Sequence, residues 1–392
     1  MNGTFSVPPH KRRVGFFLTG SLIAFVAACS GNNAVPVTGS APGNPAAAQS
    51  IVRPDTGVLP NDTTSILKKL TKDVLIGSTV DPTNGDTGPR GVAVVRANYV
   101  LKKGEIVVCN FADKNGNPGA GTTIELFSPA PSSTPATFVQ SSKSAGCDGV
   151  ATTEGNDVYD SALTAGNVTG WSNTGGFVKS YGSPLKAPLA IAEASNSNFY
   201  AAEYIFASDA STGGIVSWSI NNYGNPKPLE VATGFGVNKG SGWSALGPLG
   251  LAYYPKKDQL FIADTQTNTV VYFTHASELL VKDEIVVQPD GKSFKCKYPG
   301  SRNPCGKLVK AGSPLKAPGT MAILPNGNII VANTGNNQVI EMTASGQVLD
   351  QHAVVKSKTG AIYGLWAIGT NDSNTALYYT NKNTNTLHEL EQ

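Results

Sequence analysis

The chain of 392 residues contains the stretch Gln259-Leu-Phe-Ile-Ala-Asp-Thr-Gln-Thr-Asn-Thr-Val-Val-Tyr-Phe273, in which two short apolar runs flank a polar turn. Runs of β-branched and aromatic residues separated by Asp, Asn and Thr are typical of antiparallel strands. The segment just before it, Gly247-Pro-Leu-Gly-Leu-Ala-Tyr-Tyr-Pro255, predicts another strand. We therefore expect residues 247–273 to form consecutive strands of one meander.

The same order of residues recurs along the chain. Its best copy is Pro318-Gly-Thr-Met-Ala-Ile-Leu-Pro-Asn-Gly-Asn-Ile-Ile-Val-Ala-Asn-Thr-Gly-Asn-Asn-Gln-Val-Ile-Glu-Met342, and the hexapeptide Ser-Pro-Leu-Lys-Ala-Pro occurs at both 183–188 and 313–318. Looser copies lie at 91–127, 149–171, 205–218 and 363–390. A repeated strand unit predicts a repeat architecture, here with six units over about residues 88–392.

The two best units resemble NHL repeats, in which a hydrophobic-Ala-Asp/Asn-Thr strand lies between two other strands. Ile262-Ala-Asp-Thr265 and Val331-Ala-Asn-Thr334 match that core. A sheet of three or four strands cannot bury both of its faces alone, but sheets arranged radially pack on one another. The resemblance implies an all-β, six-bladed β-propeller with one unit in each blade.

The closure of this ring can also be predicted. The last unit ends at Leu390, close to Gln392, and is one strand short. Residues 72–77 precede the first unit and could supply the missing outer strand, while Ile66, Leu67, Leu70 and Val74 fit a short helix before that strand. We expect a propeller domain at 61–392, closed by this N-terminal strand.

The N-terminus has the features of a targeting segment. Basic residues 10–13 precede an apolar run at 14–28, which is short for a membrane span. The run ends in Val26-Ala-Ala-Cys29, which resembles a bacterial lipobox. The resemblance implies a lipoprotein signal peptide at 1–28 and acyl chains such as palmitate on Cys29, which make the membrane a partner. The alternative is an ordinary signal peptide cut nearby, with Cys29 incidental.

Residues 29–60 consist mainly of small and polar residues and predict a flexible tether. Ser30 follows Cys29, and the absence of Asp there, by resemblance to Gram-negative sorting, points to the outer membrane. The net charge of +3 equals the contribution of Lys11, Arg12 and Arg13, because 1–28 contains no Asp or Glu. The processed chain is therefore near neutral, and we expect a monomer without a nucleic-acid partner.

Four cysteines remain after Cys29, and an even number in an exported chain favours disulfides. Cys296 and Cys305 enclose a short loop, which leaves Cys109 with Cys147. Four cysteines allow three connectivities, and proximity favours this one. A four-cysteine zinc site would require paired close spacings, which are absent.

An Asp or Asn recurs at the end of the second strand in five of the units, and two interpretations of these residues are possible. They could form a ring that binds a cation or ligand, or cap the following turns; one residue per unit at this position favours capping. They are Asn110, Asp209, Asp264, Asn333 and Asn381. The loops 81–86 and 113–119 have oxygen spacings similar to calcium loops but depart from the EF-hand pattern, so plain turns are favoured there too.

Candidate ligand-facing residues follow from the resemblance, because the first strands of propeller blades line the central channel. Met321 and Trp366 lie in such strands. Trp243 lies in a loop, where it either contacts a partner or plugs the mouth of the channel. Trp171, Trp218 and Phe273 share a position near the end of the third strand and predict packing between blades.

No catalytic signature occurs in the sequence, and the histidines after residue 28 lack metal-ligand spacing, so we expect no metal or cofactor. One hypothesis is a binding or scaffold module for a protein or small molecule. The alternative is a metal-dependent hydrolase that resembles six-bladed lactonases and needs three acidic or amide side chains at the channel axis. The first strands carry almost no carboxylates. Glu193 and Glu203 are exceptions, but both belong to one unit, so the hypothesis of a binding module is favoured.

Overall fold

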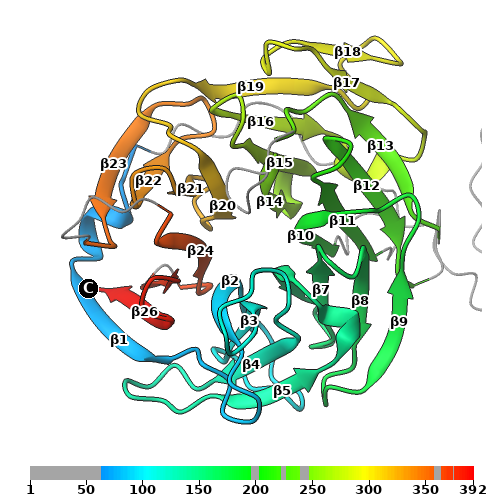
Figure 1. Ribbon diagram of the computed structural model, residues 1–392. Helices are drawn as coiled ribbons and strands as arrows, with labels where there is room; N and C mark the ends of the chain where they lie inside the picture. Colours follow the sequence, from blue (N-terminus) through cyan, green and yellow to red (C-terminus); the bar gives the residue numbers. More distant parts are fainter. Residues whose placement is uncertain (1–62, 196–202, 222–226, 239–246, 357–362, 374) are drawn as a thin grey trace, which may run out of the picture. The chain divides into compact units, whose positions relative to one another are not determined.

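The computed structural model describes residues 63–195, 203–221, 227–238, 247–356, 363–373 and 375–392. Six sheets are arranged around a central axis, and the first strand of each lies nearest to it (Figure 1). The chain is thus an all-β, six-bladed propeller, as predicted.

Each of the first two blades is a four-stranded antiparallel meander. Blade 1 consists of β2 (Thr87–Val94), β3 (Ile106–Ala112), β4 (Thr123–Phe127) and β5 (Ala136–Gln140). Blade 2 consists of β6 (Cys147–Thr152), β7 (Val158–Ala162), β8 (Asn167–Trp171) and β9 (Phe177–Tyr181). The short helix η2 (Ser142–Ser144) connects them.

The next three blades repeat this order. Blade 3 begins with β10 (Pro188–Ser195), β11 (Glu203–Asp209), β12 (Gly214–Ser219) and β13 (Leu229–Thr233). Blade 4 consists of β14 (Pro248–Tyr254), β15 (Gln259–Asp264), β16 (Thr269–Thr274) and β19 (Gly306–Ala311), with η3 at Pro255–Lys257 and η4 at Ala276–Glu278. Blade 5 consists of β20 (Pro318–Ile323), β21 (Ile329–Asn333), β22 (Gln338–Met342) and β23 (Val348–Ala353).

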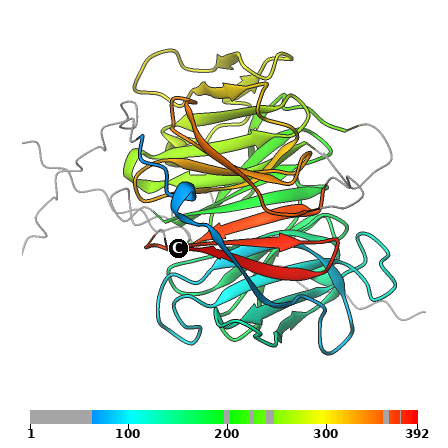
Figure 2. The same cartoon turned by 90° about the vertical axis from the view of Figure 1, so that its left-hand side faces the viewer.

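The sixth blade joins the two ends of the ring. Its strands β24 (Leu365–Thr370), β25 (Ala376–Asn381) and β26 (Thr386–Glu391) are completed by β1 (Lys72–Ser78), which pairs antiparallel with β26 from Lys72↔Glu391 to Ser78↔Thr386. Figure 2 shows this N-terminal strand, in blue, beside the red strands of the last blade. The predicted closure is confirmed. A short helix, η1 (Leu67–Lys69), precedes the strand as expected, but Val74 of the predicted helix pattern lies in β1, where it pairs with Glu389.

A hairpin that the repeat pattern did not predict extends blade 3. Strands β17 (Ile285–Val287) and β18 (Phe294–Cys296) lie between β16 and β19 in the chain, yet β17 pairs in parallel with β13 of the preceding blade. The resulting sheet has six strands. The disulfide Cys296–Cys305 links the end of this hairpin to the residue before β19.

The hydrophobic core is divided among the spaces between blades. Trp171 of blade 2 packs with Cys109 and Ile124 of blade 1, and Trp218 of blade 3 packs with Tyr181 of blade 2. Phe273 of blade 4 belongs likewise to a cluster shared with blade 3. The predicted role of these residues between blades is confirmed. Because each blade covers its neighbour, the ring buries faces that a single sheet would expose.

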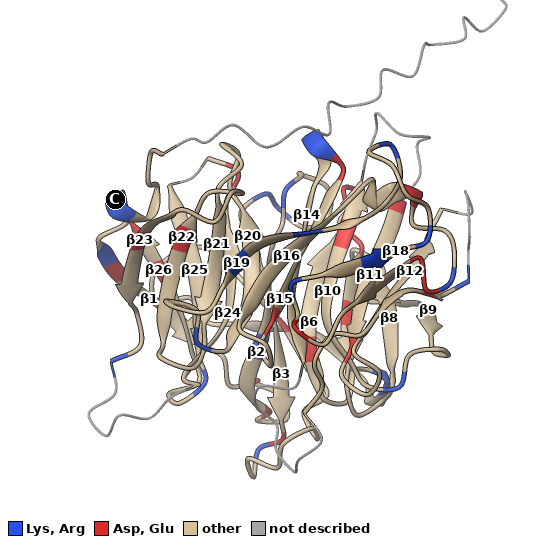
Figure 3. Cartoon of the chain, turned by 90° about the horizontal axis from the view of Figure 1, so that it is seen from above, with Lys and Arg blue, Asp and Glu red and all other residues tan. Residues whose placement is uncertain are grey.

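No helix among the described residues has the length and apolar character needed to cross a membrane. The predicted signal peptide 1–28, the tether 29–60 and Cys29 lie outside the described residues. Basic and acidic side chains both occur around the ring in the described part (Figure 3).

Candidate ligand site in the central channel

The wall of the channel is made by the six inner strands, each of which is an edge strand of its sheet. One side of every inner strand therefore presents backbone NH and CO groups toward the axis. By the register of pairing, one position in these strands always holds a very small residue: Ala93, Ala151, Ala192, Ala252, Ala322 and Gly369. Short side chains at this position leave room inside the ring.

A cavity of about 350 Å³ occupies this space, and all six of these small residues line it. Its mouth lies where the inner strands end and carries both signs of charge. Arg96, Lys256 and Asp372 follow three different inner strands, and Glu193 lies near the end of β10. A cavity of this size with a few polar groups is typical of a small-molecule site.

The other end of the channel is defined by a bulge at the beginning of each inner strand. In β2 the register shifts between Pro89 and Gly91, and in β6 between Cys147 and Gly149, so that Arg90 and Asp148 are the bulged residues. The other four inner strands have an equivalent shift. A bulge can redirect a side chain away from the regular face of a strand.

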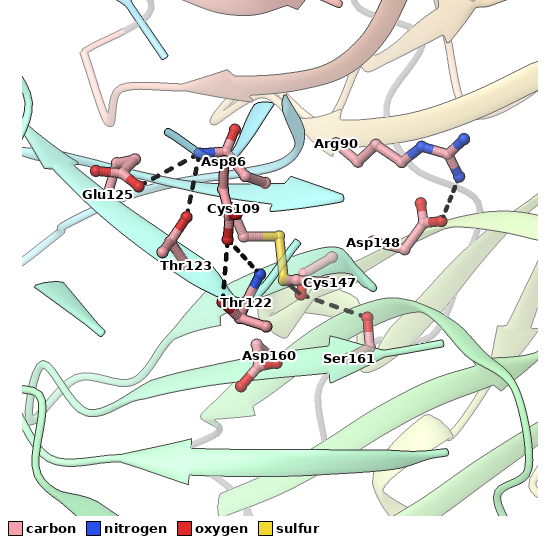
Figure 4. The surroundings of a disulfide bond; sticks show 12 residues. Asp86, Arg90, Cys109, Thr122, Thr123, Glu125, Cys147, Asp148, Asp160 and Ser161 are labelled. Carbon is pink, nitrogen blue, oxygen red and sulfur yellow. Dashed lines mark hydrogen bonds and ion pairs between the residues drawn. A yellow bond between two sulfur atoms is a disulfide. The ribbon is translucent and has the colours of Figure 1, made fainter. Parts of the chain in front are cut away.

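Arg90 and Asp148 form a buried ion pair across blades 1 and 2, with 2.8 Å between Nη1 and Oδ2 (Figure 4). The other carboxylate oxygen, Oδ1, accepts a hydrogen bond of 3.0 Å from Nε1 of Trp366. The guanidinium lies 3.5 Å from the ring centroid of Phe111 and 4.0 Å from that of Trp366. Both carboxylate oxygens of Asp148 are therefore engaged by protein groups, and we call these four residues the Arg90 cluster.

Burial changes the protonation behaviour of cations in and beside this cluster. It lowers the pKa of Arg90, which the carboxylate of Asp148 opposes. It also lowers the pKa of Lys382 to about 8, and repulsion from Arg90 adds to this effect. The Nζ atom of Lys382 lies 4.5 Å from the ring centroid of Trp366. Two cations thus face the same indole, and the second of them has a lowered pKa.

Glu193 is the unusual carboxylate at the open end. Burial raises its pKa to about 8, the hydroxyl of Ser195 donates a hydrogen bond that lowers it, and Glu203 adds repulsion. Arg96, which follows β2 of blade 1, lowers the pKa of Glu193. The raised pKa favours the protonated carboxyl, which can donate a hydrogen bond to a ligand.

The candidate ligand-facing residues predicted from the sequence lie in different places in the structure. Met321 lines the cavity. Trp366 does not line it: the side chain is fully buried in the Arg90 cluster, at the end of the cavity marked by Asp148. Trp243 lies outside the described residues.

Both expected disulfides are present, and one of them lies beside the Arg90 cluster. Cys109 of β3 is bonded to Cys147 of β6, so the bond joins blades 1 and 2 next to Asp148 (Figure 4). Cys296 is bonded to Cys305 in the extended hairpin.

The repeated polar residues cap the following turns in three blades, as predicted. The Oδ1 atoms of Asp209, Asp264 and Asn381 each accept the backbone NH two residues ahead. Asn333 differs slightly, because its Oδ1 accepts the NH of Lys316 in the loop before β20. For Asn110 the prediction is wrong: the turn after β3 begins later, and this side chain donates to Thr79 O, Thr123 and Glu125 instead.

Sequence reasoning identified Trp366 of the Arg90 cluster but missed Arg90, Asp148 and Lys382. A signal for Arg90 existed, since Gly-Pro-Arg-Gly places an arginine at the start of an inner strand, where the units of blades 3 to 6 carry apolar residues or glycine. Within the described residues, no three His, Cys, Asp or Glu side chains lie together in an arrangement that could hold a metal ion.

Comparison with known proteins supports the architecture. A protein of unknown function from Bacteroides thetaiotaomicron VPI-5482 superimposes with a TM-score of 0.53 at 14% identity, over 81% of this chain and 75% of that chain. A gluconolactonase from Xanthomonas campestris gives a TM-score of 0.54 at 12% identity, over 86% and 96%. No family model and no curated protein matches the sequence. At these identities the similarity shows the six-bladed propeller fold alone.

Proposed function

We propose that this chain is an envelope-anchored binding protein whose central cavity takes up a small polar molecule. The observation that carries the proposal is the cavity of about 350 Å³, lined by a ring of alanine and glycine residues and by polar groups at one mouth. The lipobox at Cys29 supports anchoring to a membrane through a lipid, with the outer membrane favoured by Ser30.

The polar groups at the mouth favour a ligand that carries a carboxylate. Arg96 and Lys256 can attract an anion, while a protonated Glu193 can donate to a hydroxyl or carbonyl oxygen. The backbone edges of the inner strands add further hydrogen-bonding groups. A small hydroxy acid has both kinds of acceptor and suits this combination.

The alternative of a metal-dependent hydrolase does not fit the residues of the channel. Asp148 uses both oxygens on Arg90 and Trp366, and Asp372 forms ion pairs with Arg96 and Lys103. Among the carboxylates that line the cavity in the described part, this leaves Glu193, and one carboxyl group cannot hold a divalent cation firmly. We therefore derive no hydrolytic step.

Calorimetric titration of the full chain in detergent with gluconate, lactate and benzoate tests the cavity. We expect saturable binding of at least one of these acids, and about tenfold or more weaker binding after Lys256→Ala, because a charge-assisted hydrogen bond is lost. Lys143→Ala is the matched control, since Lys143 lies over Phe177, away from the residues that line the cavity. Failure of all three acids to bind, or equal affinity in the Lys256 variant, contradicts the proposal.

Metabolic labelling with a palmitate analogue tests the anchor separately. We expect the label to be lost in Cys29→Ser and retained when Cys296 and Cys305 are both replaced by serine. A Cys29→Ser protein that keeps the label excludes lipidation at this residue.

A further inference from the structure

A disulfide-bonded segment on the outer rim of blades 3 and 4 carries an excess of positive charge. Residues 291–310 include six basic residues and no Asp or Glu, whereas residues 29–392 as a whole are formally near neutral. The segment contains β18 and most of β19, and Figure 3 shows Lys and Arg, in blue, on and beside these strands. We call residues 291–310 the basic rim. Its cations are Lys292, Lys295, Lys297, Arg302, Lys307 and Lys310.

Contacts with blades 3 and 4 hold the basic rim against the ring. Strand β18 pairs with β17, which itself extends the sheet of blade 3. Phe294 packs against the core cluster shared by these blades, with its ring centroid 6.4 Å from that of Phe273. The Cys296–Cys305 bond closes the loop, and the NH of Thr274 donates to the carbonyl of Cys305 at 3.0 Å. The positive charges therefore lie on a supported scaffold outside the repeat.

Strand geometry directs several of these cations to solvent. Successive side chains of a strand point to opposite faces. Phe294 and Cys296 are half-buried, whereas Lys295 and Lys297, which alternate with them, are exposed, as is Lys307 on β19. None of the ion pairs between described residues involves a cation of the basic rim. Their charge is therefore available to a partner.

The acidic residues that precede the basic rim do not cancel its charge. Asp290 caps its own turn, where both of its carboxylate oxygens accept hydrogen bonds from the next residues. Glu284 is buried, and its Oε2 accepts two backbone NH groups of the preceding loop. With these flanking residues included, the segment 282–310 has seven basic and three acidic residues and a net charge of +4 (7 − 3).

Two large apolar side chains are exposed among the cations. Tyr298 follows Lys297 and is 44% exposed, and Leu308 follows Lys307 and is 43% exposed. Nζ of Lys297 lies 5.9 Å from the ring centroid of Tyr298. At a lipid–water interface, tyrosine lies at the level of the headgroups, and lysine buries its apolar stem while its ammonium stays in water. A soluble polyanion would pair with the cations but would leave these apolar side chains in water.

We propose that the basic rim is a contact surface for a membrane that contains anionic phospholipids. The lipid phosphates complement the positive charge of the segment, and each Lys or Arg near such a surface strengthens binding by about fivefold. Tyr298 and Leu308 enter the interface beside the cations. No residue of the basic rim lines the central cavity, so the contact and the cavity can act at the same time.

The contact has a consequence for the anchoring proposed above. A lipid on Cys29 would hold the chain near a bilayer but, through residues 29–60, would leave the orientation of the ring open. A basic rim bound to phosphates fixes which side of the ring faces the surface. The contact itself does not depend on that lipid.

Hydrogen exchange of the full chain reconstituted into vesicles tests the contact. Vesicles of POPC alone are compared with vesicles of POPC and anionic POPG. A lipid on Cys29 inserts into both, so the difference between them reports on charge. We expect exchange at residues 294–310 to slow by about tenfold with POPG and to recover in 0.5 M salt, which screens the attraction.

Equal exchange at residues 294–310 in the two kinds of vesicle overturns the proposal. A chain that associates with POPG vesicles but not with POPC vesicles contradicts the lipid on Cys29 and still supports the basic rim. Polygalacturonate added to the full chain in detergent provides a soluble polyanion. If it slows exchange in this segment and POPG does not, the partner is an acidic polysaccharide and the membrane assignment is wrong.

The triple variant Lys295→Gln/Lys297→Gln/Lys307→Gln should abolish the response to POPG, because three cations together contribute about a hundredfold. All three side chains are exposed, so the substitutions leave the core unchanged. A response to POPG that survives in this variant overturns the assignment.

The matched control removes the same number of charges elsewhere on the ring. It replaces three exposed lysines of η1, of the turn after β3 and of β9 by glutamine: Lys69, Lys114 and Lys179. We expect this control to keep the response to POPG. An equal loss in both variants would show an effect of overall charge and would overturn the assignment to the basic rim.

Discussion

The two ends of β2 carry two arginines in different surroundings. Arg90, near the start of the strand, pairs with Asp148 at 2.8 Å, and the two side chains are 5% and 0% exposed. Arg96, just after its end, lies 3.8 Å from Asp372, with exposures of 66% and 43%. Both pairs connect blade 1 to an adjacent blade, one on each side.

The difference in burial makes the two ion pairs contribute differently to the stability of the fold. The exposed pair is screened by water and contributes little to stability, but its members can exchange partners. In the buried pair each charge depends on the other, because neither can regain its hydration in the fold. The channel therefore has a fixed end, made by the Arg90 cluster, and an adaptable end, where a ligand could replace Asp372 as the partner of Arg96.

The largest effect is expected at the fixed end. Asp148→Ala leaves the Arg90 guanidinium buried without its carboxylate and should lower the free energy of unfolding by about 3–5 kcal/mol. Urea denaturation followed by tryptophan fluorescence measures this loss. The double variant Arg90→Met/Asp148→Leu should recover much of it, since no buried charge remains. A loss below about 1 kcal/mol in the single variant would remove the distinction between the two ends.

An intermediate effect is expected from Lys382, beside the fixed end. Its pKa is lowered to about 8 in the folded protein but is ordinary in the unfolded chain, so between these values the unfolded state binds more protons and stability rises with pH. Lys382→Met should remove this rise and stabilise the protein at pH 7 by about 1–3 kcal/mol. Urea denaturation at pH 7 and pH 9 measures the difference. Lys103→Met, at the adaptable end, should leave the pH dependence unchanged, and an equal change in both variants contradicts the prediction.

The smallest effect is expected at the adaptable end. Arg96→Ala should change the free energy of unfolding by less than about 1 kcal/mol, because the side chain is exposed and its ion pair is screened. The same denaturation experiment measures it, with and without 0.5 M salt. A loss above about 2 kcal/mol, insensitive to salt, would show that the two ends are alike.

The fold could be predicted because its signals are local. The segment Ile262-Ala-Asp-Thr265 specifies a strand and the turn after it within a few residues, and the capping contact of Asp264 confirms this. Asn110 occupies the corresponding position, opposite a proline of its inner strand, but the following hairpin is longer. Its side chain therefore has no adjacent turn to cap and contacts the β1–β2 connection.

The functional groups were harder to predict because they depend on contacts between blades. Arg90 and Asp148 are 58 residues apart and meet because two bulges direct them together. The partners of Glu125 likewise come from a loop more than 35 residues earlier in the chain, since β1 belongs to the last blade. The parallel pairing of β17 with β13 involves an insertion that lies outside the repeat. Periodicity identifies which strands exist and carries no information on such contacts.

The pairing of Lys72 with Glu391 brings the beginning of the ring and the end of the chain to the same corner of blade 6. An affinity tag or fluorescent reporter fused after Gln392 would therefore emerge next to the segment that precedes β1. A short linker between these two points would also allow circular permutation, with new ends opened in a connection between blades. Such a permutant would carry any attached anchor at a rim position of the experimenter's choice, so the orientation of the channel relative to a surface could be varied without altering the residues that line it.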